Sequence, residues 1–351
     1  MLKIKREFVD RALRAASPQE LHELLQGAIE LEHATIPVYL TAMISLKPGQ
    51  NREIWRVIHS VVIEEMLHFC IAANVINALG GRPVINKPGF VPAYPGPLPM
   101  HINGSLVVGL EPFSKALVKD VFMEIEEPED PLVFPVKAFG AAAAPPTFAT
   151  IGQFYRAIQE KIDELAPDRL PGDPARQVAN HSFFSDKDLF PVTTKREAIE
   201  ALRIIVEQGE GTSTSPVDET GELAHYYRFE ELYVGRRLVV DPASPEGYSF
   251  SGAVFPFDAQ GVYPLAPNTK AADLPGQSEQ RRQADQFNRL YTSLLDGLHR
   301  TFDGQPGALD ATFGLMYDLK LVGERLAAME YPGKSENTVG PPFEFNPAVA
   351  R

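Results

Sequence analysis

The 351-residue sequence has one cysteine, one tryptophan and no run of roughly 18 uninterrupted apolar residues. A lone Cys70 cannot form an internal disulfide, which fits a reducing compartment, so we expect a cytoplasmic protein. Its place in an apolar helical pattern favours packing over a role as a nucleophile. Without a long apolar run we predict no membrane span, and the first twenty residues lack the apolar core of a secretory signal.

Basic residues are also scarce, because 33 lysines and arginines face 46 aspartates and glutamates for a net charge of -13. No basic surface can then neutralise phosphates, and we predict no nucleic-acid partner. The sequence has no phosphate-cradling glycine loop and no Cys-x-x-Cys pair. The acidic excess does allow carboxylates that hold metal ions.

Helical periodicity predicts a mainly α protein, which we expect to be a single elaborated domain over residues 1–351. Its bundle helices are expected at about 17–45, 52–80, 114–127, 150–166 and 194–209, the last opened by a Thr194–Glu197 capping box. The first two are long and closely connected, so they should lie antiparallel as half of a four-helix bundle.

The 31 prolines predict long irregular connections, such as 82–112 with a short strand at 105–110. The strand-like pieces "RRLVV" and "YSF" lie among proline and glycine in an irregular insertion at about 211–277. Long structured loops often carry function, which makes this insertion a candidate lid. A C-terminal helical pair is expected over 278–331, at about 278–303 and 308–331.

Three polar residues lie in phase with the apolar stripes of the first two helices. Glu32 follows Ala28 by four positions, and Glu65 follows Val61 by four with His68 three later, whereas Glu64 continues a polar row. An unpaired buried carboxylate costs several kcal/mol, so an inward glutamate needs an ion partner, a proton or a metal.

One Glu on one helix and a Glu-x-x-His pair on its neighbour make up half the ligand set of a carboxylate-bridged di-metal centre. The alternative is an internal Glu65–His68 hydrogen bond, with Glu32 protonated or paired to an arginine. Oxygen and nitrogen ligands without thiolates favour iron or manganese over structural zinc.

Further ligands would have to come from later segments. Glu207 and Glu210 stand three apart, the spacing of a second ligand pair, but their phase fits a solvated helix end equally well. Three glutamates in "FMEIEEPE" are not distinguished by the apolar stripe beside them. His225 in "AHYYRF" could complete a metal shell or form a hydrogen bond within the core.

The stretches "AIELEHATIPVYLTAMISL" and "IHSVVIEEMLHFCIAANVINALGGRP", with "FMEIEEPE", "TIGQFYRAI", "VEQGEG" and "HYYRFEEL", resemble a known family. They are similar to the ferritin-like domain of the iminophenyl-pyruvate dimer synthases of violacein and indolocarbazole biosynthesis, and to related bacterial ferritin-like proteins. The resemblance runs from about residue 17 to the final "GPPFEF" and covers only the ferritin-like part of those much longer synthases.

The resemblance implies a ferritin-like bundle elaborated with long loops. It also implies a metal-ligand set, namely Glu32, Glu65, His68, Glu126, Glu207, Glu210 and, as an addition, His225. Those synthases join two imines of aromatic 2-oxo acids oxidatively and are associated with haem iron. The implied role is in bacterial secondary metabolism.

Together these observations predict an iron-dependent oxidoreductase, with a di-iron centre or manganese in its place. Its substrates would be dioxygen and a small organic molecule, such as an imine derived from an aromatic 2-oxo acid. The alternative is a non-catalytic ferritin-like protein that stores, senses or delivers iron or supports another enzyme. A third possibility is a bundle without metal. A substrate-sized cavity beside the carboxylates would favour the enzyme. The sequence assigns no catalytic residue beyond the ligands and no oligomeric state.

Overall fold

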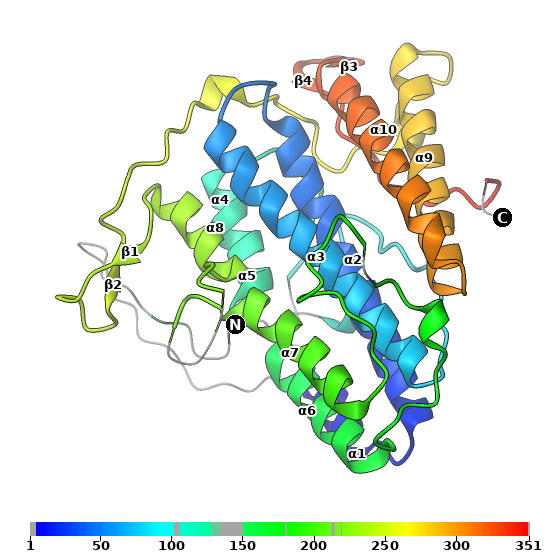
Figure 1. The fold of residues 1–351 in the computed structure, drawn as a ribbon. Coiled ribbons are helices and arrows are strands. Elements are labelled where there is room, and N and C mark those ends of the chain that lie inside the picture. The colour runs from blue at the N-terminus through cyan, green and yellow to red at the C-terminus, as the bar shows by residue number, and fades with distance from the viewer. Residues whose placement is uncertain are drawn as a thin grey trace.

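The computed structural model describes residues 5–101, 106–128, 132, 150–179, 181–211, 215–218 and 220–349 (Figure 1). Its α-helices are α1 Arg6–Arg14, α2 Pro18–Ser45, α3 Arg52–Ala78, α4 Lys115–Leu117, α5 Met123–Glu126, α6 Ile151–Leu165, α7 Lys195–Glu210, α8 His225–Val234, α9 Glu279–Phe302 and α10 Leu309–Ala327. The short helical turns are η1 Pro99–His101, η2 Val118–Phe122, η3 Pro174–Arg176, η4 Ala259–Gly261, η5 Ala271–Asp273 and η6 Pro306–Ala308. Two small antiparallel sheets pair β1 Val239–Val240 with β2 Tyr248–Ser249, and β3 Glu330–Tyr331 with β4 Lys334–Thr338.

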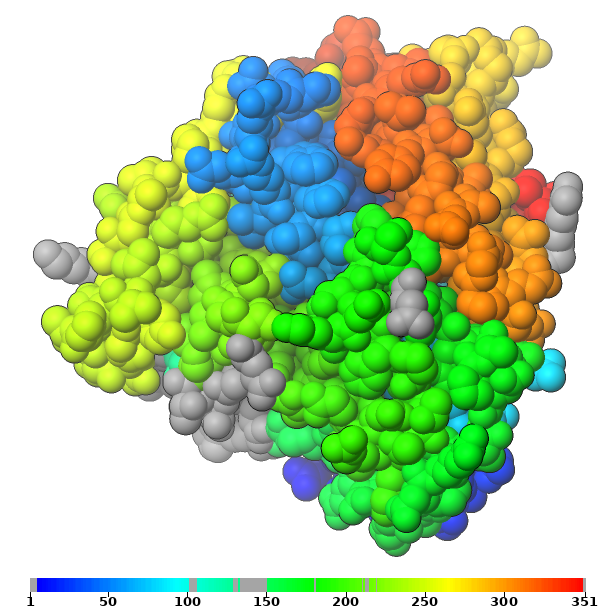
Figure 2. Space-filling view, viewed as in Figure 1, coloured from blue at the N-terminus to red at the C-terminus, as the bar shows by residue number. Residues whose placement is uncertain are grey.

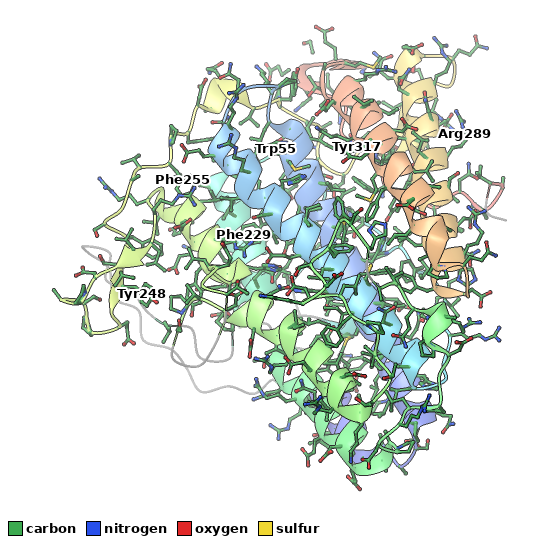
Figure 3. All side chains as sticks on the ribbon, viewed as in Figure 1. Trp55, Phe229, Tyr248, Phe255, Arg289 and Tyr317 are labelled. Atoms are coloured by element: carbon green, nitrogen blue, oxygen red, sulfur yellow. The ribbon has the colours of Figure 1, made fainter. Side chains whose placement is uncertain are left out.

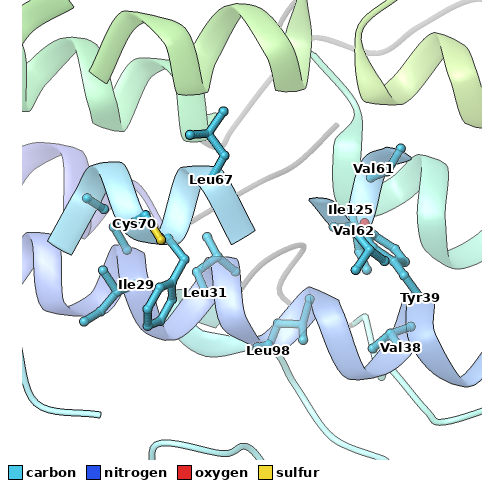
Figure 4. Packing of buried hydrophobic residues seen from close by; sticks show 14 of the residues in the cluster. Ile29, Leu31, Val38, Tyr39, Val61, Val62, Leu67, Cys70, Leu98 and Ile125 are labelled. Carbon is cyan, nitrogen blue, oxygen red and sulfur yellow. The ribbon is translucent and has the colours of Figure 1, made fainter. Parts of the chain in front are cut away.

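The antiparallel pair α2 and α3 forms the centre of the protein, as predicted. Side chains of both helices and of α5 belong to one continuous hydrophobic core, part of which is drawn in Figure 4. Helix α3 is long and apolar enough to cross a membrane by composition, but 83% of its most apolar window is buried inside the protein. That burial is typical of a core helix.

Two interrupted columns of shorter helices pack against this central pair. Helices α6 and α7 pack on each other, and α8 contacts α3, α5 and α7. In Figure 1, α8 continues the direction of α7, and α5 continues that of α6. One column therefore breaks between Glu126 and Ile151, and the other breaks between Glu210 and His225.

The short helix that carries Glu126 has an irregular winding. Ser114 caps its start by accepting a hydrogen bond from the Leu117 backbone N–H. The turn Val118–Phe122 is a π-helix, after which α5 resumes α-geometry. A π-turn adds a residue to one turn and shifts the phase of everything after it, which is why regular periodicity could not choose among the glutamates of "FMEIEEPE".

The predicted mainly helical fold is confirmed, including the Thr194–Glu197 capping box and the C-terminal pair α9 and α10. Helix α10 ends at Ala327, because the chain then enters the β3–β4 hairpin. Helix α1 was not predicted. The expected strand at 105–110 is wrong within the described residues, where Val108 makes a single bridge to Gly96.

The prediction for residues 211–277 was partly wrong. The two strand-like pieces do pair as β1 and β2, but the segment also contains α8, a ten-residue helix that packs into the bundle. This segment therefore contributes a bundle helix where a lid had been considered.

Candidate metal centre

Five of the predicted ligand residues converge at the break in the two helical columns. All five are buried, with Glu65, His68 and His225 at most 3% exposed. They come from four helices: Glu32 from α2, Glu65 and His68 from α3, Glu126 from the last turn of α5 and His225 from the first residue of α8. A carboxylate at the C-terminal end of a helix is disfavoured by the helix dipole, so Glu126 needs a compensating positive charge.

Each of the three carboxylates has one oxygen held by a hydroxyl group. Tyr155 donates to Oε1 of Glu32 over 2.5 Å, and Thr35 donates to Oε2 of Glu65 over 2.7 Å. Tyr39 donates to Oε1 of Glu126 in a short hydrogen bond. These bonds fix the direction in which each carboxylate presents its second oxygen.

The second oxygens face the Nδ1 atoms of the two histidines. Nδ1 of His68 lies 3.7 Å from Oε2 of Glu32 and 3.7 Å from Oε1 of Glu65. Nδ1 of His225 lies 3.0 Å from the same Oε1 of Glu65 and 3.5 Å from Oε2 of Glu126. Glu65 is therefore shared by two overlapping sets of ligand atoms.

The 3.0 and 3.5 Å distances at His225 are close to those between ligand atoms that share one ion, and the 3.7 Å distances at His68 are longer. Two ligands about 2.1 Å from one ion at tetrahedral or octahedral angles lie about 3.0–3.4 Å apart. The His68 contacts are too long for hydrogen bonds. Nδ1 of His225 is close to two carboxylate oxygens, yet it makes no hydrogen bond of acceptable geometry to any described residue. Glu65, His68 and His225 bring their ligand atoms within 4.8 Å of one another.

The outer nitrogen of each histidine ring is bound to a fixed acceptor. Nε2 of His68 donates to Oε1 of Gln208 over 3.0 Å. Nε2 of His225 donates to Oε2 of Glu64 over 3.0 Å, and Arg228 holds the other oxygen of Glu64 at 2.7 Å. When the outer nitrogen carries the proton, Nδ1 keeps its lone pair for a metal.

In the absence of a cation, protons must compensate the buried charge. Burial and the neighbouring Glu126 raise the pKa of Glu65 to about 7, and the adjacent imidazole of His225 opposes this rise. Burial lowers the pKa of His225, but contacts with Glu126, Glu64 and Glu65 outweigh it and leave that pKa well above its usual value. Burial also lowers the pKa of His68. Contacts with Glu32 and Glu65 outweigh this effect, so the pKa of His68 is raised.

The alternative that arginines neutralise the inward glutamates finds no support among the described residues. Glu32 and Glu65 face the same histidine and form their ion pairs with imidazole nitrogens. The arginine at the centre, Arg228, binds Glu64 instead. Burial also raises the pKa of Cys70 to about 12, in keeping with a packing role for this thiol.

The second predicted pair does not join the cluster in the same way. Glu207 forms an ion pair with Arg203 on the surface of α7, where its side chain is 19% exposed. The side chain of Glu210 lies outside the described residues. Helix α7 nevertheless reaches the centre through Val206 and Gly209, which line the cavity beside the carboxylates.

Several functional side chains were missed by sequence reasoning. Tyr39 and Tyr155 were assigned to the apolar stripes of their helices. Helical periodicity cannot distinguish a tyrosine whose hydroxyl makes a hydrogen bond from any other aromatic residue in a core. Glu64 was expected to face solvent, because it continues a row of polar residues along α3. That row is covered by α8, whose Arg228 contacts both Ser60 and Glu64.

The cavity beside the carboxylates is small, at about 40 Å³. Besides Glu32, Glu65, His68 and Glu126 it is lined mainly by aliphatic side chains. It has room for ions and one or two small molecules of the size of water. A drug-sized organic molecule needs a pocket of about 300 Å³ or more.

Comparisons with known proteins agree with this architecture. A family model described as Ferritin-like matches residues 25–234, a span that includes all five converging residues. Dichlorochromopyrrolate synthase from Lentzea aerocolonigenes is 26% identical over 326 residues, 82% of this chain but only 29% of that protein. The chain thus spans less than a third of that curated relative. The crystal structure of a ferritin-like protein from Caulobacter vibrioides is 24% identical with a TM-score of 0.58, over 91% of this chain and 97% of that one, a likeness of fold.

Proposed function

Since this protein belongs to the ferritin-like family, whose model matches well over half of the chain, we propose that its buried carboxylate–histidine cluster binds two metal ions. The observation that carries the proposal is the shared carboxylate. Oε1 of Glu65 faces the Nδ1 atoms of both His68 and His225, and the outer nitrogen of each ring is bound to a separate acceptor.

The residues fall into two groups that would each hold one ion. Glu32, Glu65 and His68 would hold the first, and Glu65, Glu126 and His225 would hold the second. Glu207 and Glu210 remain predicted additional ligands, of which Glu207 would have to leave Arg203 to contribute. The hydroxyl groups of Tyr39, Tyr155 and Thr35 would hold the carboxylates in place.

Iron and manganese fit this donor set best, because carboxylate oxygens and imidazole nitrogens without thiolates suit these metals. The charges also balance approximately. Three carboxylates and two neutral imidazoles carry -3, and two divalent cations carry +4, which leaves one positive charge for a bound hydroxide or substrate anion.

We further propose that the protein is an oxidoreductase that uses dioxygen. A pair of redox-active metals, when bound, supplies electrons to dioxygen and an oxidant to a substrate. The protein side chains exclude bulk water from the cluster, and the cavity of about 40 Å³ has room for a molecule as small as dioxygen. The similarity to a biosynthetic enzyme, dichlorochromopyrrolate synthase, supports a small organic substrate. The family resemblance suggests that this substrate is an imine derived from an aromatic 2-oxo acid.

The second candidate function is non-catalytic binding, storage or delivery of iron. The small cavity favours it, because the described residues leave no room beside the carboxylates for an aromatic substrate. In this case the same ligands would take up metal ions, and oxidation would stop once the bound metal was oxidised.

Metal analysis of protein purified without chelator tests the centre. We expect close to two iron or manganese ions per chain in the wild type and fewer than half as many in Glu65→Ala and His68→Ala. The matched control is Glu30→Ala, since Glu30 lies on the outer side of α2 and pairs with Lys87 at 2.9 Å. Equal metal content in all four proteins would refute the centre.

Oxygen consumption then separates the two functions. After anaerobic loading with ferrous iron, a storage protein consumes dioxygen in proportion to the iron added and stops. An oxidoreductase continues to consume dioxygen when an oxidisable aromatic amine or imine is supplied. Continued turnover that persisted equally in Glu65→Ala would exclude the metal centre as its source.

A further inference from the structure

A second and larger cavity lies on the other side of the central helix pair. Its volume is about 200 Å³, and it is enclosed by α2, α3, α9, α10 and the loop around Phe183. On α2 it is lined by His33, Ile36 and Leu40, each one position after a residue that faces the metal cluster, namely Glu32, Thr35 and Tyr39. The two sites therefore use different faces of the same helices.

The position of this cavity separates it from the matched family core. Helices α9 and α10, residues 279–327, lie outside the matched span of 25–234 and supply much of its wall. Figure 2 shows a part of this boundary, where α3 in light blue, α10 in orange and the green loop near Phe183 meet at the surface.

The wall of the cavity is almost wholly apolar. Phenylalanines and methionines line it, including Phe69, Phe184, Phe313, Met66 and Met316. Methionine adapts to ligands of different shape, and aromatic rings favour contact with other flat groups. An apolar cavity of about 150 Å³ is large enough to bind benzene, so this cavity can enclose a body of about one ring or a short alkyl chain.

The wall of the cavity includes one partly exposed cationic side chain, Lys320 of α10. Lys320 and His59 of α3 line the cavity, and the ring of Trp55 contacts both of them. Figure 3 shows Trp55 on α3 and Tyr317 on α10 at this end of the molecule. Glu324 approaches Lys320 at 3.6 Å, and both side chains are more than a third exposed, so the lysine is not neutralised by a buried partner.

One polar side chain lies deep in the wall. His33 is 3% exposed, and its Nε2 contacts the Tyr291 hydroxyl at 2.9 Å. Its Nδ1 makes no hydrogen bond to any described residue. A buried polar atom without a partner costs free energy.

From these features we propose that the cavity between α2–α3 and α9–α10 binds a compact apolar anion, an aromatic or short-chain carboxylate, whose apolar part is enclosed and whose charge lies near Lys320. This site is separate from the metal cluster, and its occupation requires neither metal nor redox chemistry.

Trp55 provides a direct probe, because it is the single tryptophan of the chain and its ring lies beside Lys320 and His59, which line the cavity. We expect phenylacetate and hexanoate to change its fluorescence in a saturable way, with one site per chain confirmed by calorimetry. The neutral alcohols 2-phenylethanol and hexanol should bind more weakly. Comparison of phenylacetate with hexanoate distinguishes a preference for rings from one for alkyl chains.

Two variants and one control assign the binding to this cavity. Ile63→Trp places an indole in the cavity wall and should lower the affinity for both acids at least tenfold by calorimetry. Leu321→Trp is the matched control, since Leu321 is 52% exposed on α10 and does not line the cavity. Lys320→Ala should weaken the acids about fivefold or more and leave the alcohols unchanged.

The metal content of Ile63→Trp should equal that of the wild type, which also checks that the variant is folded. If neither phenylacetate nor hexanoate bound in a saturable way, the proposal would be overturned. Binding that Ile63→Trp leaves unchanged would overturn it as well, and neither result would affect the metal centre.

Discussion

Glu64 offers the sharpest test of how the centre is built, because it contacts no predicted metal ion. It accepts a hydrogen bond from Nε2 of His225 at 3.0 Å and one from Arg228 at 2.7 Å. Burial raises the pKa of Glu64, but these contacts with His225 and Arg228 outweigh it and bring the pKa to about 2. The difference from the usual 4.5 corresponds to about 3 kcal/mol in favour of the ionised carboxylate.

The Glu64→Gln variant keeps the shape of this side chain and removes its charge. One amide oxygen can still accept from His225 or from Arg228, but it cannot serve both as a charged partner. The Nδ1 lone pair of His225 would then be less firmly directed at the cluster. Loss of such an outer partner typically weakens metal binding 10- to 100-fold, about 1.4–2.7 kcal/mol.

Competition with a coloured chelator under anaerobic conditions measures this change for ferrous iron or manganese. Glu53→Gln is the matched control, since Glu53 lies on the same helix and pairs with Arg237 at the surface. We expect the control to bind metal within about twofold of the wild type. Thermal unfolding of the metal-free proteins checks that Arg228, left with a weaker partner, does not unfold the variant.

A Glu64→Gln protein that is folded and binds both ions with wild-type affinity would refute the reasoning. It would mean that the direction of the His225 ring is set by packing alone. A loss of metal equal to that in Glu65→Ala would also contradict it, because Glu64 would then behave as a direct ligand.

Three other variants test separate parts of the structure. We expect Glu207→Ala to weaken the binding of one ion about tenfold or more in a chelator competition, as for a predicted ligand that leaves Arg203 when metal binds; metal binding within about twofold of the wild type would remove Glu207 from the ligand set. Tyr155→Phe leaves Glu32 without its hydroxyl donor and should destabilise the metal-free protein by about 1–3 kcal/mol in urea unfolding, but the metal-loaded protein by less, because a cation satisfies the same carboxylate. Burial raises the pKa of Glu230 to about 7, so the folded state loses stability as the pH rises from about 4.5 to 7. The Glu230→Gln variant should therefore be more stable than the wild type at pH 8, by at most about 3 kcal/mol. At pH 4.5 it should be no more stable than the wild type. An unchanged difference between the two pH values would contradict that assignment.

The two central helices and three inward residues could be read directly from the sequence. Glu32, Glu65 and His68 lie on long, regular helices, so a period of 3.6 residues predicts their direction correctly. Glu126 could not be chosen in this way, because the π-turn at Val118–Phe122 shifts its phase. It was reached only through the family resemblance.

His225 marks a second limit of sequence patterns. It is the first residue of α8, and a residue at a helix start has no preceding turn against which a phase can be measured. The outer shell is harder still, because Glu64 and Gln208 are polar residues on polar faces. Only the tertiary structure shows that α8 covers the first and that His68 contacts the second.

The breaks in the helical columns explain how five ionisable groups can meet inside a bundle. A continuous helix in place of α7 and α8, or of α5 and α6, would present side chains at fixed intervals along its face and could not bring its end residues to the centre. The breaks let Glu126, Gln208 and His225 approach from helix termini, whereas α2 and α3 remain unbroken and hold Glu32, Glu65 and His68. Hydroxyl groups from α2 and α6 then hold one oxygen of each carboxylate. Because these bonds also exist without a cation, the fold itself keeps three carboxyl groups together, and metal ions would replace the protons that compensate them and stabilise the folded state.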